Sequence, residues 1–162
     1  MLTTDAATRW RSGSPFLALG GAAIIAGGLL AAVVGLPGTA MFNLPLRHFA
    51  WASAYLVLIV GVAQIVFGAG QAWLSARVPE TRWVAGEWVV FNLGNAGVIA
   101  GTLCARFWMV LAGTLLFAAG IALFLLGTRD GVRDGWLVGY RVLPALIFLS
   151  SLVGLALALG GR

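Results

Sequence analysis

The stretch FWMVLAGTLLFAAGIALFLL, residues 107–126, contains twenty consecutive residues without a charge. At a rise of 1.5 Å per residue, about twenty helical residues cross the roughly 30 Å hydrocarbon core of a bilayer. Because that core offers no water to the backbone, the segment must satisfy its own N–H and C=O groups, and a helix does so. The stretch therefore predicts a membrane-spanning α-helix.

Four further apolar runs of similar length accompany this one. They cover residues 16–36, 49–74, 84–104 and 136–159. Short polar connections separate the runs, with breaks at Pro37, Pro79, Arg106 and the segment TRDGVRDG at 128–135. None of these connections is long enough to fold as a soluble domain. The sequence predicts an all-α, polytopic membrane protein, with one transmembrane domain over residues 1–162 and five helices.

The composition supports this class and excludes others. Hydrophobic residues make up 61% of the chain and charged residues only 9%, whereas a soluble domain carries about 25% charged residues. The net charge is +5, but every basic residue is an arginine placed singly or in a pair at the end of an apolar run. Since no basic stripe results, we expect no nucleic-acid partner. The lone Cys104 cannot form a disulfide within the chain.

The arginines also predict an orientation. If the N-terminus is cytoplasmic, seven arginines lie inside, namely residues 9, 11, 77, 82, 129, 133 and 141, and three lie outside, namely residues 47, 106 and 162. An excess of arginine on the cytoplasmic side is the usual bias of membrane proteins. We therefore expect an N-in, C-out topology in a bacterial inner (cytoplasmic) membrane.

Small residues recur at helical spacing within the runs. The rows are Gly27, Ala31 and Gly35 in the first run, Gly97 and Gly101 in the third, and Gly154 and Ala158 in the fifth. Such rows let membrane helices approach closely, either within one bundle or between chains. Five helices with this many rows favour self-association or contact with other membrane proteins, in addition to the lipid bilayer.

Polar residues inside the third run are candidates for function because they are costly in lipid. Glu87 is the only acid within a run, and Asn92 and Asn95 follow on the same helix. One interpretation is a proton or ion path that uses these three residues. The alternative is that Glu87 pairs with Arg82 or another arginine, such as Arg141, while the asparagines tie helices together.

Two glutamines lie on the second run. Gln64 and Gln71 are seven residues apart, and in a regular helix they face roughly opposite to His48 and Tyr55. We expect them to tie helices together rather than to bind a ligand.

His48 is the only histidine of the chain, and it begins the second run at the predicted outer side. Trp51 and Tyr55 follow at three and seven residues, so the three side chains share one helical face. A neutral imidazole is a good ligand for haem iron, and an aromatic face suits a macrocycle. His48 is thus a candidate metal ligand, with Trp51 and Tyr55 as candidate cofactor-binding residues. The alternative is an interfacial histidine that binds headgroups or a loop carbonyl.

A family resemblance bears on His48. The segments RHFAWASAYLVLIVGVAQIVFG, WVVFNLGNAGVIAG and VLAGTLLFAAGIALFLLGTR, between residues 47 and 129, resemble the early helices of the haem-copper oxidase subunit I-like superfamily, including NnrS-like membrane proteins. In that superfamily a histidine at the outer start of the second helix is an axial haem ligand, which implies this role for His48. The chain lacks the further histidines that such oxidases use for the second axial ligand, the second haem and copper. The resemblance therefore does not imply an oxidase acting alone.

Three functions follow from these features. The first is a non-catalytic helical subunit or oligomer in a respiratory or transport assembly. The second is a haem-binding membrane protein that uses His48. The third is an oligomeric small transporter or channel that uses Glu87, Asn92 and Asn95. No nucleophile–base pair, phosphate-binding loop or pair of carboxylates points to an enzyme.

Overall fold

A computed structural model describes residues 2–36, 46–131 and 135–160, which form helices and no strand. The first helix, α1, spans Leu2–Val34. One continuous rod follows, made of α2 (Leu46–Tyr55), the π-helical segment η1 (Leu56–Ala63) and α3 (Gln64–Leu74). The remaining helices are α4 (Thr81–Leu103), α5 (Phe107–Gly127) and α6 (Gly135–Gly160).

The five predicted helical segments are confirmed. The breaks near Pro79 and Arg106 are confirmed too, and so is the break after α5, where residues 128–131 form a turn. The break at Pro37 and residues 132–134 lie outside the described residues. The first helix is longer than the apolar run that predicted it, because α1 begins at Leu2 and the run begins at residue 16. The polar residues before Phe16 carry no apolar signal, but Arg9 donates hydrogen bonds to α3 and its following turn, and these bonds anchor the extra turns.

Four helical segments are long and apolar enough to cross a membrane: Asp5–Val34, Arg47–Leu74, Phe107–Gly127 and Gly135–Gly154. Helix α4, which corresponds to the third apolar run, is long enough at 23 residues but is not one of these four segments. Its Glu87, Asn92 and Asn95 lower its apolarity. The expectation of a fifth span, and the sides on which the termini lie, stay predictions.

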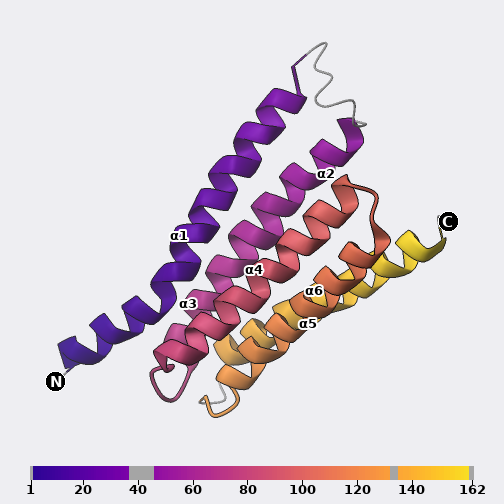
Figure 1. Cartoon of the computed structure of the whole chain (residues 1–162). Helices are drawn as coiled ribbons and strands as arrows, with labels where there is room; N and C mark the ends of the chain where they lie inside the picture. Colours follow the sequence, from indigo (N-terminus) through magenta and orange to yellow (C-terminus); the bar gives the residue numbers. More distant parts are fainter. Residues whose placement is uncertain (1, 37–45, 132–134, 161–162) are drawn as a thin grey trace.

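The helices pack as an elongated bundle (Figure 1). The first helix packs along the rod formed by α2, η1 and α3, whereas α4 packs most extensively against α5, and α6 packs against α5 and α3. Glycines explain the close α4–α5 seam: a Cβ at Gly97 would lie 2.9 Å from the Cα of Gly113, and one at Gly101 would lie 2.8 Å from Val110. The Gly97 and Gly101 row is therefore an intrachain packing row.

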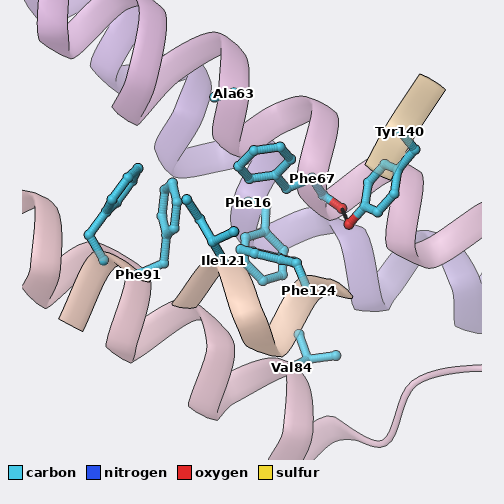
Figure 2. Close-up of a cluster of buried hydrophobic side chains, with 9 residues drawn as sticks. Phe16, Ala63, Phe67, Val84, Phe91, Ile121, Phe124 and Tyr140 are labelled. Atoms are coloured by element: carbon cyan, nitrogen blue, oxygen red, sulfur yellow. Dashed lines mark hydrogen bonds between the residues drawn. The ribbon is translucent and has the colours of Figure 1, made fainter. Parts of the chain in front are cut away.

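One aromatic cluster connects all five helical segments at the centre of the bundle (Figure 2). Phe67 is fully buried, and its ring lies 6.0 Å from that of Phe91 and 5.3 Å from that of Phe124, between ring centroids. Phe16 from α1 and Tyr140 from α6 complete the contacts at 5.3 Å to Phe124 and 6.2 Å to Phe67. Edge-to-face packing at these distances is favourable. The cluster separates the two ends of the bundle.

The π-helical segment changes which faces of the rod point the same way. In a regular α-helix, the sixteen steps from Tyr55 to Gln71 place the two side chains about 160° apart. A π-helix has i→i+5 hydrogen bonds and more residues per turn, so each residue turns less. As a result Tyr55 and Gln71 both hydrogen-bond to α4, at Asn95 and Glu87. The predicted opposite placement of Gln71 and Tyr55 was wrong for this reason.

Candidate functional site

A pocket of about 920 Å³ lies at the end of the bundle where the rod begins and α4 turns into α5. We call it the His48 pocket. Its walls come from α2 and η1 (including His48, Trp51, Tyr55 and Ile59), from α4 and α5 (including Arg106, Thr114 and Phe117) and from the second half of α6 (including Ile147, Ser150 and Ser151). The three residues predicted to bind a cofactor thus line one pocket.

Aromatic and apolar side chains make most of this pocket. The rings of Trp51 and Tyr55 lie 5.1 Å apart between centroids at an angle of 34°, which forms a continuous wall along α2. The Tyr55 hydroxyl donates to Oδ1 of Asn95 at 2.8 Å, so this ring is held in place from α4. Phe117 lines the pocket and also belongs to the aromatic cluster, which therefore closes the inner end.

Positive charge gathers in the same pocket. Arg47 and Arg106 line it together with His48, and no acidic side chain is among the described residues that do so. Arg106 follows Ala105, whose φ of 52° is in the left-handed region and makes the sharp turn between α4 and α5. The Arg106 backbone N–H donates to the Gly101 carbonyl at 2.8 Å, which fixes the turn. The arginines give this end of an otherwise apolar pocket an affinity for anionic groups.

His48 is half-buried, and its Nδ1 is buried without a hydrogen-bond partner among the described residues. Among the described residues, no cysteine or methionine lines the pocket, and Cys104 is exposed. Over the described ranges, no group of three or more histidine, cysteine or acidic residues could hold a metal ion. The described part of the pocket therefore offers a metal one strong protein ligand, the imidazole of His48. This donor set fits a metal that arrives within its own macrocycle.

Glu87 lies at the other end of the bundle, beyond the aromatic cluster. Its side chain is fully buried, and Oε1 accepts a hydrogen bond of 2.7 Å from Nε2 of Gln71. The proposed pairing with Arg82 is not formed, because Arg82 pairs with Glu80 at 2.6 Å. Arg141 does not neutralise Glu87 either, since it donates to the carbonyls of Thr128 and Arg129 at 2.6 and 3.2 Å.

The structure does not bring Glu87, Asn92 and Asn95 into one site. Eight residues of helix separate Glu87 from Asn95, which is about 12 Å along the axis. Asn92 and Asn95 donate to the carbonyls of Trp88 and Phe91 on their own helix, at 2.7 and 2.9 Å. The fully buried Phe91 lies between Glu87 and Asn95 in the sequence of α4.

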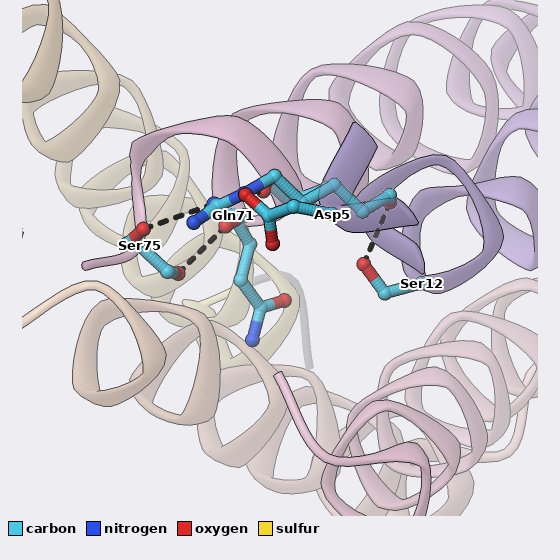
Figure 3. Close-up of polar contacts among 6 residues, drawn as sticks. Asp5, Ser12, Gln71 and Ser75 are labelled. Carbon is cyan, nitrogen blue, oxygen red and sulfur yellow. Dashed lines mark hydrogen bonds and ion pairs between the residues drawn. The ribbon is translucent and has the colours of Figure 1, made fainter. Parts of the chain in front are cut away.

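A polar cluster around Glu87 joins several helix ends. Arg9 of α1 donates to the carbonyls of Ala72 and Ser75 at 2.9 and 3.1 Å. The Ser75 hydroxyl donates to the carbonyls of Gln71 and Gly127 at 2.6 and 3.0 Å, and Figure 3 shows Ser75 and Gln71 beside residues of α1. Sequence reasoning missed Arg9 and Ser75, because neither lies in an unusual pattern.

A second cleft, of about 750 Å³, opens at this end. It lies between the α3–α4 connection and the end of α5, and Gln71, Trp83 and Gly127 are among its lining residues. Three arginines, Arg77, Arg82 and Arg129, also line it, so we call this the arginine-rich end. Gln71 thus lines the cleft and also donates a hydrogen bond to Glu87.

Comparisons with known proteins add no relative. No family model matches the sequence, and it matches no curated protein and no solved structure.

Proposed function

We propose that this chain is an integral membrane protein with five transmembrane helices that binds an amphipathic ligand in the His48 pocket, and that this ligand is a haem. The observation that carries the proposal is the convergence of His48, Trp51 and Tyr55 on one apolar pocket of about 920 Å³. Ligand sites commonly enclose about 300–1,000 Å³, so this pocket accommodates a large ligand. The resemblance around His48 supports the same ligand.

Each part of the pocket has a role in this proposal. The imidazole of His48 would bind the haem iron, and the Trp51 and Tyr55 rings would pack against the macrocycle. Arg47 and Arg106 stabilise acidic groups at its edge. The apolar walls, with Phe117 at the inner end, exclude water. A bound haem would supply an iron that can bind a small gas molecule or a ligand from another chain.

Absorbance of the purified chain tests this function. We expect the full chain, expressed with added haem and purified in mild detergent, to show a Soret band at about one haem per chain. His48→Ala is expected to lose at least nine tenths of that band, because it removes the imidazole that would bind the iron. Trp136→Phe is the matched control, since Trp136 is 81% exposed and outside the pocket.

Rescue assigns the ligand atom. Imidazole added to His48→Gly is expected to restore the band, because a free imidazole fills the space of the missing ring. The proposal is wrong if the wild-type chain takes up no haem, or if His48→Ala keeps the band at full height.

A non-catalytic subunit or oligomer is the second candidate, and outward-facing glycines favour it. Gly21 and Gly28, seven residues apart on α1, have no neighbour within 4 Å that an added Cβ would meet. Such a row lets a helix of another chain approach closely. Gly28→Leu is expected to convert an oligomer to a monomer on a native gel without loss of folded protein. A wild-type chain that runs as a monomer and co-purifies with no other protein would contradict this candidate.

A further inference from the structure

We propose that Glu87 is a proton-binding site that exchanges its proton only with the arginine-rich end of the bundle. The site is independent of the ligand in the His48 pocket, because the aromatic cluster lies between them. It also differs from a transport path through Asn92 and Asn95, which it does not use.

Glu87 has no counter-charge among the described residues. Glu87 is fully buried, its Oε1 has one neutral donor, and its Oε2 makes no hydrogen bond among the described residues. None of the ion pairs formed by the described residues includes Glu87. An ionised carboxylate that is buried without a cation is expensive, so a cation at Oε2 would remove a large cost.

The groups that face Glu87 come from every neighbouring element. Helix α3 contributes Gln71, and α5 contributes Gly127. A Cβ at Gly127 would lie 3.2 Å from Oε1 of Glu87. The Trp83 indole on α4 and the Tyr140 phenol on α6 are close enough to interact with the carboxyl group. The nearby Arg9 of α1 is held by backbone carbonyls. Arg9 is the one cation among these groups, and it donates to backbone carbonyls rather than to Glu87.

The cation that fits Oε2 of Glu87 is a proton. Hard metal ions need about six or more oxygen ligands, and no cluster of acidic or histidine residues surrounds Glu87 among the described residues. An organic cation would need lasting room beside the carboxylate, but Oε2 is buried. A covalent reagent, by contrast, needs access only while the Gln71 side chain is rotated away. A proton needs a single lone pair, which Oε2 has to spare.

The proton can reach Glu87 from the cleft at the arginine-rich end. Gln71 lines the cleft of about 750 Å³ at the arginine-rich end and also binds Glu87, so rotation of this one side chain connects the carboxyl to the cleft. In the other direction, Phe67, Phe91 and Phe124 are buried at 0% exposure and block exchange with the His48 pocket. Access is therefore one-sided.

A hydrophobic carbodiimide tests the proposal. Dicyclohexylcarbodiimide reacts with a protonated carboxyl group: the proton goes to a carbodiimide nitrogen, the carboxyl oxygen bonds to the central carbon, and acyl transfer to nitrogen gives a stable N-acylurea with no leaving group. We expect peptide mapping of the full chain in detergent micelles to find the adduct on Glu87. Once the carboxyl ionises, the rate is expected to fall about tenfold per pH unit. Glu87→Gln should lack the adduct, and Glu80→Gln, which changes an exposed acid, should keep it.

A second variant separates proton binding from simple packing. Gln71→Leu removes the hydrogen bond that stabilises the ionised carboxyl, so labelling at alkaline pH is expected to rise about tenfold. Asn95→Leu should leave labelling unchanged, because Asn95 lies beyond the aromatic cluster. The proposal is overturned if Glu87 stays unlabelled at every pH in the folded chain but reacts after unfolding, or if labelling is insensitive to pH and to Gln71→Leu.

Discussion

Replacing Gly113 with leucine is expected to lower the free energy of unfolding by about 3 kcal/mol or more and to leave little folded protein. A Cβ at Gly113 would lie 2.7 Å from the carbonyl carbon of Gly97 and 2.8 Å from the carbonyl oxygen of Gly94. These are backbone atoms, so no side chain can move aside. The two helices must separate, and α4 makes its most extensive contact with α5.

Gly86→Leu is the matched control for this experiment. Gly86 lies on α4 but has no neighbour within 4 Å that an added Cβ would meet. Leucine also favours a helix by nearly 1 kcal/mol over glycine, so this variant is expected to be neutral or slightly more stable. Unfolding in detergent, followed by tryptophan fluorescence, measures both. Equal stability of the two variants would show that the α4–α5 seam is not closely packed.

The helices could be predicted because their signal is local. Each apolar run is long enough to be a helix by itself, and the polar connections mark its ends. The first fifteen residues had no such signal. Within them, Arg9 binds carbonyls of residues more than sixty positions away. A tertiary contact of this kind cannot be read from composition or periodicity.

The π-helical segment η1 is a second feature that the sequence does not predict. Its residues, LVLIVGVA, are uniformly apolar, so they carry no polar marker that would reveal a change of register. Gly61 lies within the segment and permits its close contact with α1, since a Cβ there would lie 3.3 Å from the Gly20 carbonyl oxygen of α1. The change of winding turns Gln71 toward Glu87.

The candidate site was predictable only in part, for the same reason. His48, Trp51 and Tyr55 share a face because they lie within two turns of one helix, and the structure places them on one pocket wall. Arg106, in the α4–α5 turn, and Ser150, on α6, line the same pocket but could not be assigned to it from spacing. Likewise, Gln71 could be expected to tie helices together, but its partner Glu87 could not be identified from the sequence.

Gln64 and Gln71 should respond in opposite directions to the same substitution. Gln71→Leu is expected to lower the free energy of unfolding by about 1–2 kcal/mol, because it leaves the buried Oε1 of Glu87 without its donor. Gln64→Leu is expected to raise it by about 1–3 kcal/mol. Gln64 is fully buried, and neither atom of its amide has a hydrogen-bond partner among the described residues.

The pair is a sharp comparison because the two glutamines lie seven residues apart on α3 and leucine has a similar volume to glutamine. Equilibrium unfolding in mixed micelles measures both variants against the wild type, and Leu58→Ala, at a site that is 60% exposed, controls for the detergent. Destabilisation by Gln64→Leu would mean that its amide binds a buried water. In that case both glutamines stabilise the bundle through hydrogen bonds. Stabilisation would instead mark Gln64 as a polar group kept in the apolar core at a cost in stability, which folding alone does not explain.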